Sequence, residues 1–389
     1  MTKIAPAILI ATSASHLLND LLQSLLPSIY PILKSNLNLS FTEVGLITFV
    51  FQLTASILQP MVGIYTDRKP LPFSASIGMV SSLIGLVLLS FAGSLSLTLL
   101  AAALVGIGSA VFHPESSRIA RAASGGRYGL AQSLFQVGGN VGTAIGPLLA
   151  AFIIVQQGQG SIIYFLCIPV AAITVLYYVG SWYSNYLAQQ KSQQRKTQTT
   201  QLSLSKSAIV KAIAILLVLI FSKFFYTASM STFYTFYLID KFHLSIESAQ
   251  ISLFMYLAAI AAGTFIGGPL GDRYGRLPVI WVSILGVLPL TLAMPYANLV
   301  WTQVLSTCIG FVIASAFSAI IVYAQDLLPG RVGMVSGLFF GFAFGMGGLG
   351  AGLLGILADR TSVRFVFELC AFLPILGVLT YFLPKFRKT

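Results

Sequence analysis

The sequence predicts an all-α integral membrane protein in which twelve transmembrane helices form two pseudo-symmetric six-helix bundles. Its 389 residues are 57% hydrophobic and only 8% charged, whereas about a quarter of the residues in a soluble domain are charged. The apolar residues gather in runs of the ~20 residues needed to cross a bilayer, and the second half repeats motifs of the first. This composition excludes a soluble enzyme, a nucleic-acid binder and a disordered chain, although the net charge is +12.

The apolar runs define the predicted spans, which are joined mostly by short connections. The exception is the polar stretch 185–206, which separates a predicted N-terminal bundle, 1–184, from a C-terminal bundle, 207–389. Transmembrane strands are excluded because the runs are about twice as long as the ~10 residues of a barrel strand and do not alternate. The predicted spans are 5–33, 41–66, 72–92, 95–118, 129–155, 160–184, 208–239, 247–271, 277–296, 299–324, 332–358 and 364–384.

The distribution of lysine and arginine orients these helices. With the N-terminus inside, 17 of the 22 basic residues fall in cytoplasmic segments and four in outer segments, and Lys223 lies within a span. Cytoplasmic loops of membrane proteins carry such an excess, so both termini are predicted to be cytoplasmic. The first apolar run is too long for a signal peptide and is predicted to be the first span.

The two halves carry the same motifs at nearly constant offsets. The segment Gly63–Arg68 after the second span matches Gly268–Arg273 after the eighth at an offset of 205, and Arg127–Gly129 matches Arg331–Gly333 at 204. Two six-span halves related in parallel are characteristic of the major facilitator superfamily. The duplication suits alternating access, in which two similar bundles move about a central site. We therefore expect a transporter and not an enzyme.

The repeated loops contain candidate conformational motifs. After the eighth span, an acid and two arginines surround a tight glycine turn that can dock on neighbouring helix ends and stabilise one conformation. The first-half copy continues with Lys69 and Pro70, so its Gly-Arg portion is missing. Either copy can instead be a basic loop that only sets the orientation of the helices in the membrane. The candidate residues are Asp67, Arg68, Gly268, Asp272, Arg273 and Arg276.

The fifth span carries a second candidate motif. Gly142, Gly146 and Pro147 are similar to the fifth-span motif associated with antiporters of the superfamily. Glycines at four-residue steps also allow close approach of two helices, so packing explains them equally well.

The first span holds candidate proton-coupling residues, because a charge within a span is costly and usually functional. His16 and Asp20 lie one helical turn apart on one face, with Asn19 adjacent. A partly desolvated carboxylate there can bind and release a proton near neutral pH. The alternative is a neutral His–Asp pair that only locks helices together.

Further candidates lie in the fourth and seventh spans. Glu115 is a second candidate proton site, and it can pair with Arg118 three residues later. Lys223 suits an anionic substrate, or it pairs with Asp20. The polar residues of other spans either line a cavity or join helices. The candidate substrate-binding residues are Asn19, Gln52, His113, Arg118, Gln136, Lys223 and Tyr226.

Cofactors and metals are not expected. The three cysteines are far apart without metal-binding spacing, and the chain contains no P-loop that would indicate ATP as the energy source. The expected partners are a small anionic compound, protons and the lipid bilayer, without nucleic acid, and the protein is expected to be a monomer.

Five segments carry a specific family resemblance: Ser15–Asp20, Phe51–Pro60, Phe112–Arg118, Gly125–Asn140 and Tyr323–Arg331. Together they resemble the bacterial fosmidomycin-resistance family of the major facilitator superfamily, over the whole chain except 185–206. The resemblance implies a multi-pass inner-membrane protein that exchanges protons for a small anionic drug, a phosphonate with a hydroxamate. The alternatives are a proton-coupled symporter or exporter of an anionic metabolite, a lipid flippase and, with the weakest support, an intramembrane enzyme.

Overall fold

The computed structural model describes residues 4–39, 41–149, 153–193, 205–244 and 246–385, and within these ranges it contains helices and no strands. This confirms the predicted all-helical fold. Nine of the described helical segments are long and apolar enough to cross a membrane, and Ser74–Ser90 is a shorter apolar helix. The nine segments are consistent with the predicted twelve spans, and the count of twelve stays a prediction.

The chain divides into two compact units. One contains residues 1–203 and 328–341, and the other contains 204–327 and 342–389. The predicted domain boundary at 185–206 stays a prediction, because residues 194–204 lie outside the described part of the chain. The helix that precedes them continues to Gln193, nine residues beyond the predicted end of the sixth span.

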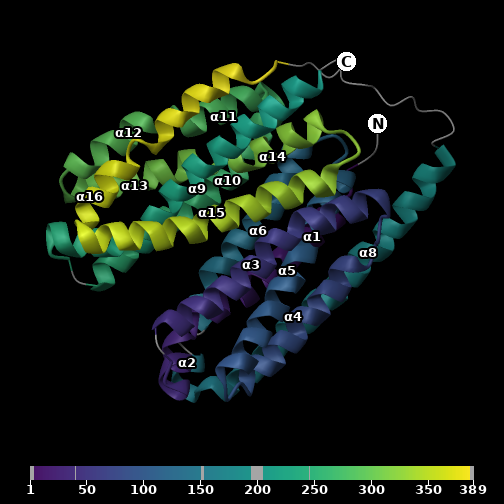
Figure 1. Ribbon diagram of the computed structural model, residues 1–389. Helices are drawn as coiled ribbons and strands as arrows, with labels where there is room; N and C mark the ends of the chain where they lie inside the picture. The colour runs from purple at the N-terminus through teal and green to yellow at the C-terminus, as the bar shows by residue number, and fades with distance from the viewer. Residues whose placement is uncertain (1–3, 40, 150–152, 194–204, 245, 386–389) are drawn as a thin grey trace. The chain divides into compact units, whose positions relative to one another are not determined.

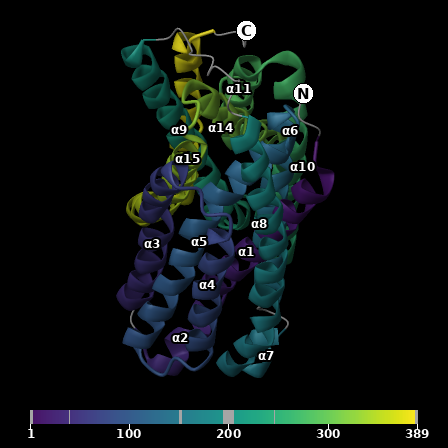
Figure 2. The ribbon, with the colours of Figure 1, turned by 90° about the vertical axis from the view of Figure 1, so that its right-hand side faces the viewer.

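The first unit is built around the pairing of two helices, α1 and α6, which correspond to the predicted first and fifth spans. The most extensive contacts are those of α1 with α6 and of α5 with α3 and α4, and Figures 1 and 2 show α3, α5 and α4 as neighbours. The helices are α1 (Pro6–Ser28), α2 (Tyr30–Leu37), α3 (Phe41–Arg68), α4 (Ser74–Ser90), α5 (Leu95–Ala123), α6 (Tyr128–Leu149), α7 (Val155–Gln157), η2 (Gln159–Leu166), α8 (Cys167–Gln193) and residues 332–341 of α15 (Val332–Arg360).

Glycines explain why α1 and α6 approach so closely. At three positions of α6 that are spaced four residues apart, a side chain in place of glycine would overlap an atom of α1. The pairs are Gly138 with the carbonyl of Ser13, Gly142 with the carbonyl of Leu17, and Gly146 with the hydroxyl of Ser24. Packing therefore accounts for these glycines, while the antiporter motif stays a prediction and the side chain of Pro147 lies outside the described residues.

The second unit has an aromatic core. Tyr226, Tyr234, Tyr237 and Phe367 are buried within it, and the rings of Tyr237 and Phe367 stack at 4.5 Å. Figure 1 shows its helices in colours from teal through green to yellow. They are α9 (Lys206–Phe242), α10 (Ile246–Tyr274), α11 (Arg276–Ile284), α12 (Leu288–Ala293), η3 (Met294–Tyr296), α13 (Leu299–Ala314), α14 (Ala316–Leu327), the remainder of α15, α16 (Val363–Cys370) and η4 (Leu373–Phe382).

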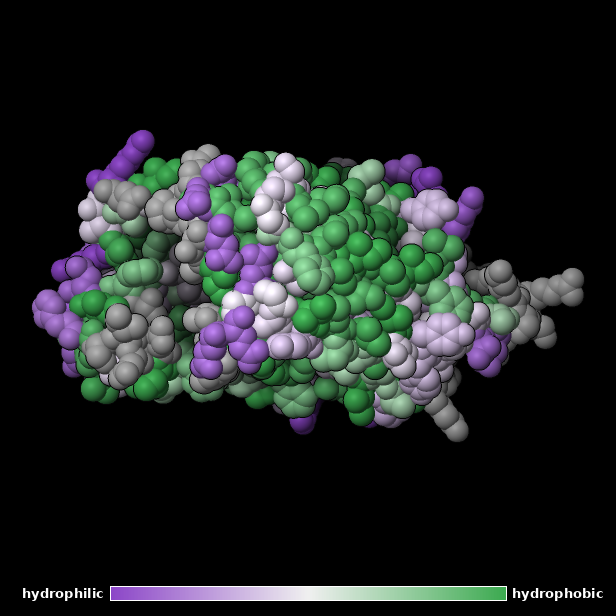
Figure 3. All heavy atoms as spheres, turned by 90° about the horizontal axis from the view of Figure 1, so that it is seen from below, coloured by the Kyte–Doolittle hydropathy of each residue, from purple (hydrophilic) through white to green (hydrophobic). Residues whose placement is uncertain are grey.

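The surface of both units is rich in apolar side chains. Large exposed residues such as Phe49, Ile77, Phe254 and Trp301 lie on different helices, and Figure 3 shows continuous apolar areas on the visible face. A surface of this kind needs hydrocarbon as its solvent, because monomeric soluble proteins rarely expose large apolar patches.

Replacement of Gly142 with alanine tests the α1–α6 contact. The new methyl group would overlap the carbonyl of Leu17, so we expect Gly142→Ala to lower the free energy of unfolding by about 1–3 kcal/mol. Gly160→Ala is the matched control, because space is open around that helical glycine. The Tm of both variants is measured by thermal unfolding in detergent. An unchanged Tm in Gly142→Ala would contradict the packing account.

Candidate functional site

A buried carboxylate lies in the middle of α1. Asp20 is 9% exposed, and its Oδ1 accepts hydrogen bonds from the side-chain amides of Asn19 at 2.9 Å and Gln23 at 3.0 Å. His16, one turn earlier, places its Nε2 3.2 Å from Oδ2. The i,i+4 spacing explains this pairing. The acid is thus flanked by three side chains of its own helix, and two of them donate hydrogen bonds to it.

A second imidazole approaches the same acid from α5. The Nε2 of His113 lies 3.6 Å from Oδ1 of Asp20, and both histidines are almost fully buried. The ring of His16 stacks on Phe135 of α6 with centroids 4.0 Å apart, and His113 contacts the ring of Phe340 at 5.2 Å. Residues of four helices, α1, α5, α6 and α15, therefore surround one carboxylate, and the described residues contain a His–Asp–His cluster.

An ion-pair network on α3 and α5 forms a second polar cluster. The guanidinium of Arg118 donates to Glu115 at 2.6 Å and to Asp67 at 2.7 Å, and it also donates to the hydroxyl of Thr66 at 2.9 Å. All three charged side chains are less than a tenth exposed. Arg118 thus balances two carboxylates, which is the usual requirement for ionised groups in a protein interior.

Asp67 also caps the start of α15. Its two carboxylate oxygens accept hydrogen bonds from the backbone N–H groups of Gly333, at 2.9 Å, and Met334, at 2.8 Å. The free N–H groups at the start of a helix carry partial positive charge and favour an anion. A second link is the hydroxyl of Ser117, which lies 2.9 Å from that of Ser336. Residues 332–341 of α15 are thereby fastened to α3 and α5.

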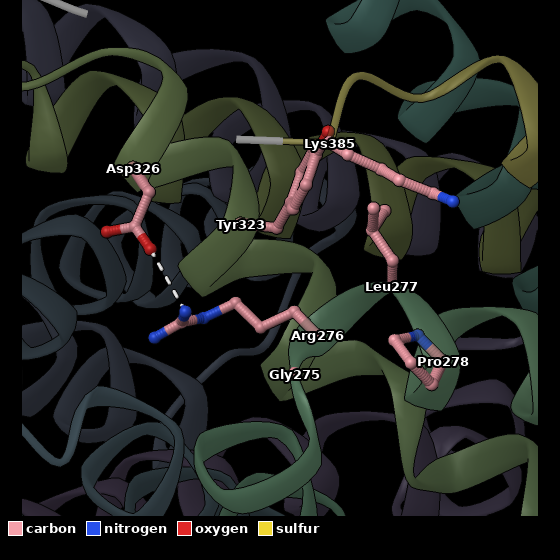
Figure 4. Close-up of a pocket in the computed structure, with 7 residues that line it drawn as sticks. All are labelled: Gly275, Arg276, Leu277, Pro278, Tyr323, Asp326 and Lys385. Carbon is pink, nitrogen blue, oxygen red and sulfur yellow. Dashed lines mark ion pairs between the residues drawn. The ribbon is translucent and has the colours of Figure 1, made fainter. Parts of the chain in front are cut away.

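The corresponding motif of the second unit has a different arrangement. Arg276, at the start of α11, lies 3.5 Å from Asp272 and 3.3 Å from Asp326 of α14. Figure 4 shows the Arg276–Asp326 pair beside a pocket of about 440 Å³, which Tyr323 and Lys385 also line.

The other residues of these two motifs differ in exposure. Arg68 and Arg273 are exposed, and Gly268 is buried. The conformational role of both motifs stays a prediction.

Lys223 of α9 is a buried cation. It is 5% exposed, and its Nζ lies 3.5 Å from the carbonyl oxygen of Ala314, where α13 ends. The ring of Phe317 lies 5.2 Å from the ammonium. Within its own unit, the described residues give this ammonium no carboxylate partner.

The remaining predicted substrate residues are spread over several helices. Tyr226 follows Lys223 by one turn of α9 and is 1% exposed. Gln136 of α6 is 8% exposed, with a side-chain oxygen that has no hydrogen-bond partner among the described residues. Gln52 of α3 is half-buried. Their part in substrate binding stays a prediction.

Sequence reasoning missed several members of these clusters. Gln23 is three residues from Asp20, so helical spacing could have identified it. Asp326 and the Ser117–Ser336 pair lie on helices that are distant in sequence from their partners, and no local pattern reveals them. The same holds for the approach of His113 to Asp20.

Comparison with known proteins settles the family. The model of the Major Facilitator Superfamily matches residues 12–350 and 215–389. The chain belongs to the major facilitator superfamily. It is 60% identical over 381 residues to the fosmidomycin resistance protein of Escherichia coli, covering 98% of this chain and 93% of that protein. It is also 42% identical over 383 residues to an uncharacterized MFS-type transporter of Bacillus subtilis, with the same coverage.

Solved structures of the superfamily share this fold. The fucose:proton symporter of Escherichia coli matches with a TM-score of 0.73 at 14% identity, over 98% of this chain and 99% of that chain. A human organic anion transporter matches with a TM-score of 0.76 at 13% identity, over 97% and 99%. The protein is therefore a multi-pass membrane transporter of this superfamily.

Asp67→Asn tests the cap of α15. The variant replaces charged hydrogen bonds, each contributing about 1.5–3 kcal/mol, so we expect about 10- to 100-fold faster amide hydrogen exchange at Gly333 and Met334. Hydrogen exchange of the full-length protein with mass spectrometry measures this. Asp272→Asn, the equivalent change in the other motif, should leave the first turn of α15 unchanged. Equal exchange in Asp67→Asn and wild type would show that the cap contributes nothing.

Proposed function

We propose that the protein exports a small fosmidomycin-like anion across the bacterial inner membrane in exchange for protons, by alternating access. The observation that carries the proton coupling is the buried carboxylate of Asp20 between two imidazoles. The substrate class comes from the name of the 60% identical relative. The protein works as a monomer with both termini in the cytoplasm, and it needs no cofactor or nucleic acid.

Asp20 is the principal proton site. A carboxylate within a span is costly when ionised and unpaired, and among the described residues of its unit the titratable groups that face it are two histidines. Proton binding and release therefore change the charge of this cluster. Glu115 is the second candidate. We rank it below Asp20 because Arg118 already balances its charge at 2.6 Å.

Exchange requires that protons and substrate exclude each other. Without added protons, the cluster of Asp20, His16 and His113 presents hydrogen-bond acceptors, to which the N–OH group of a hydroxamate can donate. Protonation fills the same acceptors and releases the substrate. The proton and the substrate then compete for one site, which is the condition for antiport.

Cationic side chains bind the acidic end of the substrate in this mechanism. Lys223 suits that role best, because within its own unit it faces a carbonyl and aromatic rings but no acid. Arg118 is a further candidate once it is released from its carboxylates. The neutral candidates are Asn19, Gln52, Gln136 and Tyr226.

The membrane potential supplies enough energy for this exchange. One proton that moves down a potential of 100 mV provides ~2.3 kcal/mol. With tight coupling, this free energy supports about a fifty-fold substrate gradient per proton.

Transport into inverted membrane vesicles tests the proposed function. We expect labelled fosmidomycin to accumulate in energised inverted vesicles and an uncoupler to abolish the accumulation. Asp20→Asn should abolish accumulation without loss of expression, because the amide can neither take up a proton nor attract one to the two neighbouring imidazoles. Asp240→Asn removes an exposed acid of α9 and should transport normally. Full activity of Asp20→Asn would show that the coupling site lies elsewhere.

The same assay separates the alternatives. Uptake in right-side-out vesicles would indicate a symporter, and competition by an anionic metabolite would identify a different substrate. If no fosmidomycin accumulates in vesicles with normal expression and an intact gradient, the drug assignment is wrong. Movement of labelled lipid between leaflets would then support a flippase.

Lys223→Gln tests the proposed anion contact. Loss of a charged hydrogen bond costs about 1.5–3 kcal/mol, so we expect the half-saturating concentration of fosmidomycin to rise about ten-fold or more. Lys211→Gln removes an exposed lysine of the same helix and should leave it unchanged. An unaltered half-saturating concentration in Lys223→Gln would exclude the contact.

A further inference from the structure

The hydrogen bonds of His16 and His113 fix the position of their protons. The Nδ1 of His16 lies 2.7 Å from the backbone oxygen of Phe135, and the Nδ1 of His113 lies 3.0 Å from that of Ser109. A carbonyl oxygen can only accept a hydrogen bond, so we assign a proton to each Nδ1. The hydroxyl oxygen of Ser109, 3.3 Å from the Nδ1 of His113, is then a second acceptor for the same N–H. In a neutral imidazole the other nitrogen is then unprotonated. Both rings therefore turn a lone pair of Nε2 toward Asp20.

This arrangement is incomplete without additional protons. With neutral rings and an ionised acid, the Nε2 atoms lie 3.2 and 3.6 Å from carboxylate oxygens, so that acceptor faces acceptor. In keeping with this, the buried Nε2 of His16 has no hydrogen-bond partner among the residues that the structure describes. A first proton converts one contact into a hydrogen bond and makes the cluster neutral. A second proton converts the other contact as well.

Among the described residues of the first unit, the helices packed against the cluster present mainly amides, backbone groups and an aromatic ring to it. On α1, Asn19 and Gln23 donate to Oδ1 of Asp20 and hold the carboxylate in place. On α6, the cluster meets the carbonyl of Phe135 and the backbone at Gly139. Residues 332–341 of α15 contribute the ring of Phe340. The nearest other ionised groups on α5, Glu115 and Arg118, pair with each other.

We infer that His113 is a proton-coupling residue, which shares with His16 and Asp20 a single site for two protons. Both histidines are Nδ1–H tautomers when the site is empty, and each takes up its second proton at Nε2. The sequence assigned His113 to substrate binding, and this inference gives it a different role. It rests on the proposed proton coupling for its function, while the proton positions themselves can be measured without transport.

The signals of the individual histidines can be resolved by NMR, because the chain contains only three histidines. The third, His243, ends α9 with an exposed side chain. Long-range ¹H–¹⁵N spectra of the full-length protein, labelled with ¹⁵N-histidine in detergent, distinguish the Nδ1–H tautomer, the Nε2–H tautomer and the imidazolium. His243→Gln removes one set of signals and leaves the two buried rings.

We expect both buried rings to show the Nδ1–H pattern in the empty site and the imidazolium pattern once the cluster has taken up its protons. Asp20→Asn removes the carboxylate that both Nε2 atoms face, so the Nε2 signals of both rings should shift. The signals of His243 should not change in that variant. An Nε2–H tautomer in either buried ring of the empty site, or a ring whose Nε2 signal is unaffected by Asp20→Asn, would overturn the inference.

Proton counting separates this inference from the proposed function. We compare the slope of a plot of log Kd of the substrate against pH. If two protons compete with the substrate, this slope should be steeper by one in wild type than in His113→Gln. Using one substrate for both proteins cancels the titration of its own phosphonate. An identical slope excludes His113 from the site even if transport is proton-driven. Normal spectra without transport would instead refute the proposed function alone.

Discussion

The cost of removing charge from water is the constraint on which the rest of this structure depends. An ionised group within a membrane-spanning bundle is stable only when opposite charges and hydrogen bonds replace its hydration. Three clusters place buried acids beside basic side chains, and each takes its members from more than one segment. The pairing that balances a charge therefore also determines which segments pack together. The clusters are Asp20 with His16 and His113, Arg118 with Glu115 and Asp67, and Arg276 with Asp272 and Asp326.

The repeated loop motifs show the same constraint satisfied in two ways. The second-half loop supplies its own cation, Arg276, and α14 supplies an additional acid, Asp326. The first-half loop has lost that arginine, and a cation from the fourth span, Arg118, takes its place beside Asp67. Asp67 gains further stabilisation from the N–H groups at the start of α15. The missing Gly-Arg portion is thus compensated by a residue outside the motif.

The sequence predicted the fold class and the local pairs, because both depend on periodicity along one chain segment. Hydropathy identified the helices, and helical spacing placed His16 beside Asp20 and Glu115 beside Arg118. It did not predict the approach of His113 to Asp20 or of Asp326 to Arg276, since these contacts depend on how separate helices pack. It also placed the end of the sixth span at residue 184, although α8 runs to Gln193. Hydropathy detects where the apolar segment ends, whereas a helix can continue into a polar segment.

Lys223 shows what the constraint implies for transport. Its ammonium is buried against a carbonyl and aromatic rings, so within its unit the charge is incompletely balanced. The cluster around Asp20 has the opposite deficiency, because it carries excess negative charge until protons arrive. In the proposed cycle, an anionic substrate relieves the first deficiency and protons relieve the second. The energetic cost of buried charge would then be the physical origin of the exchange.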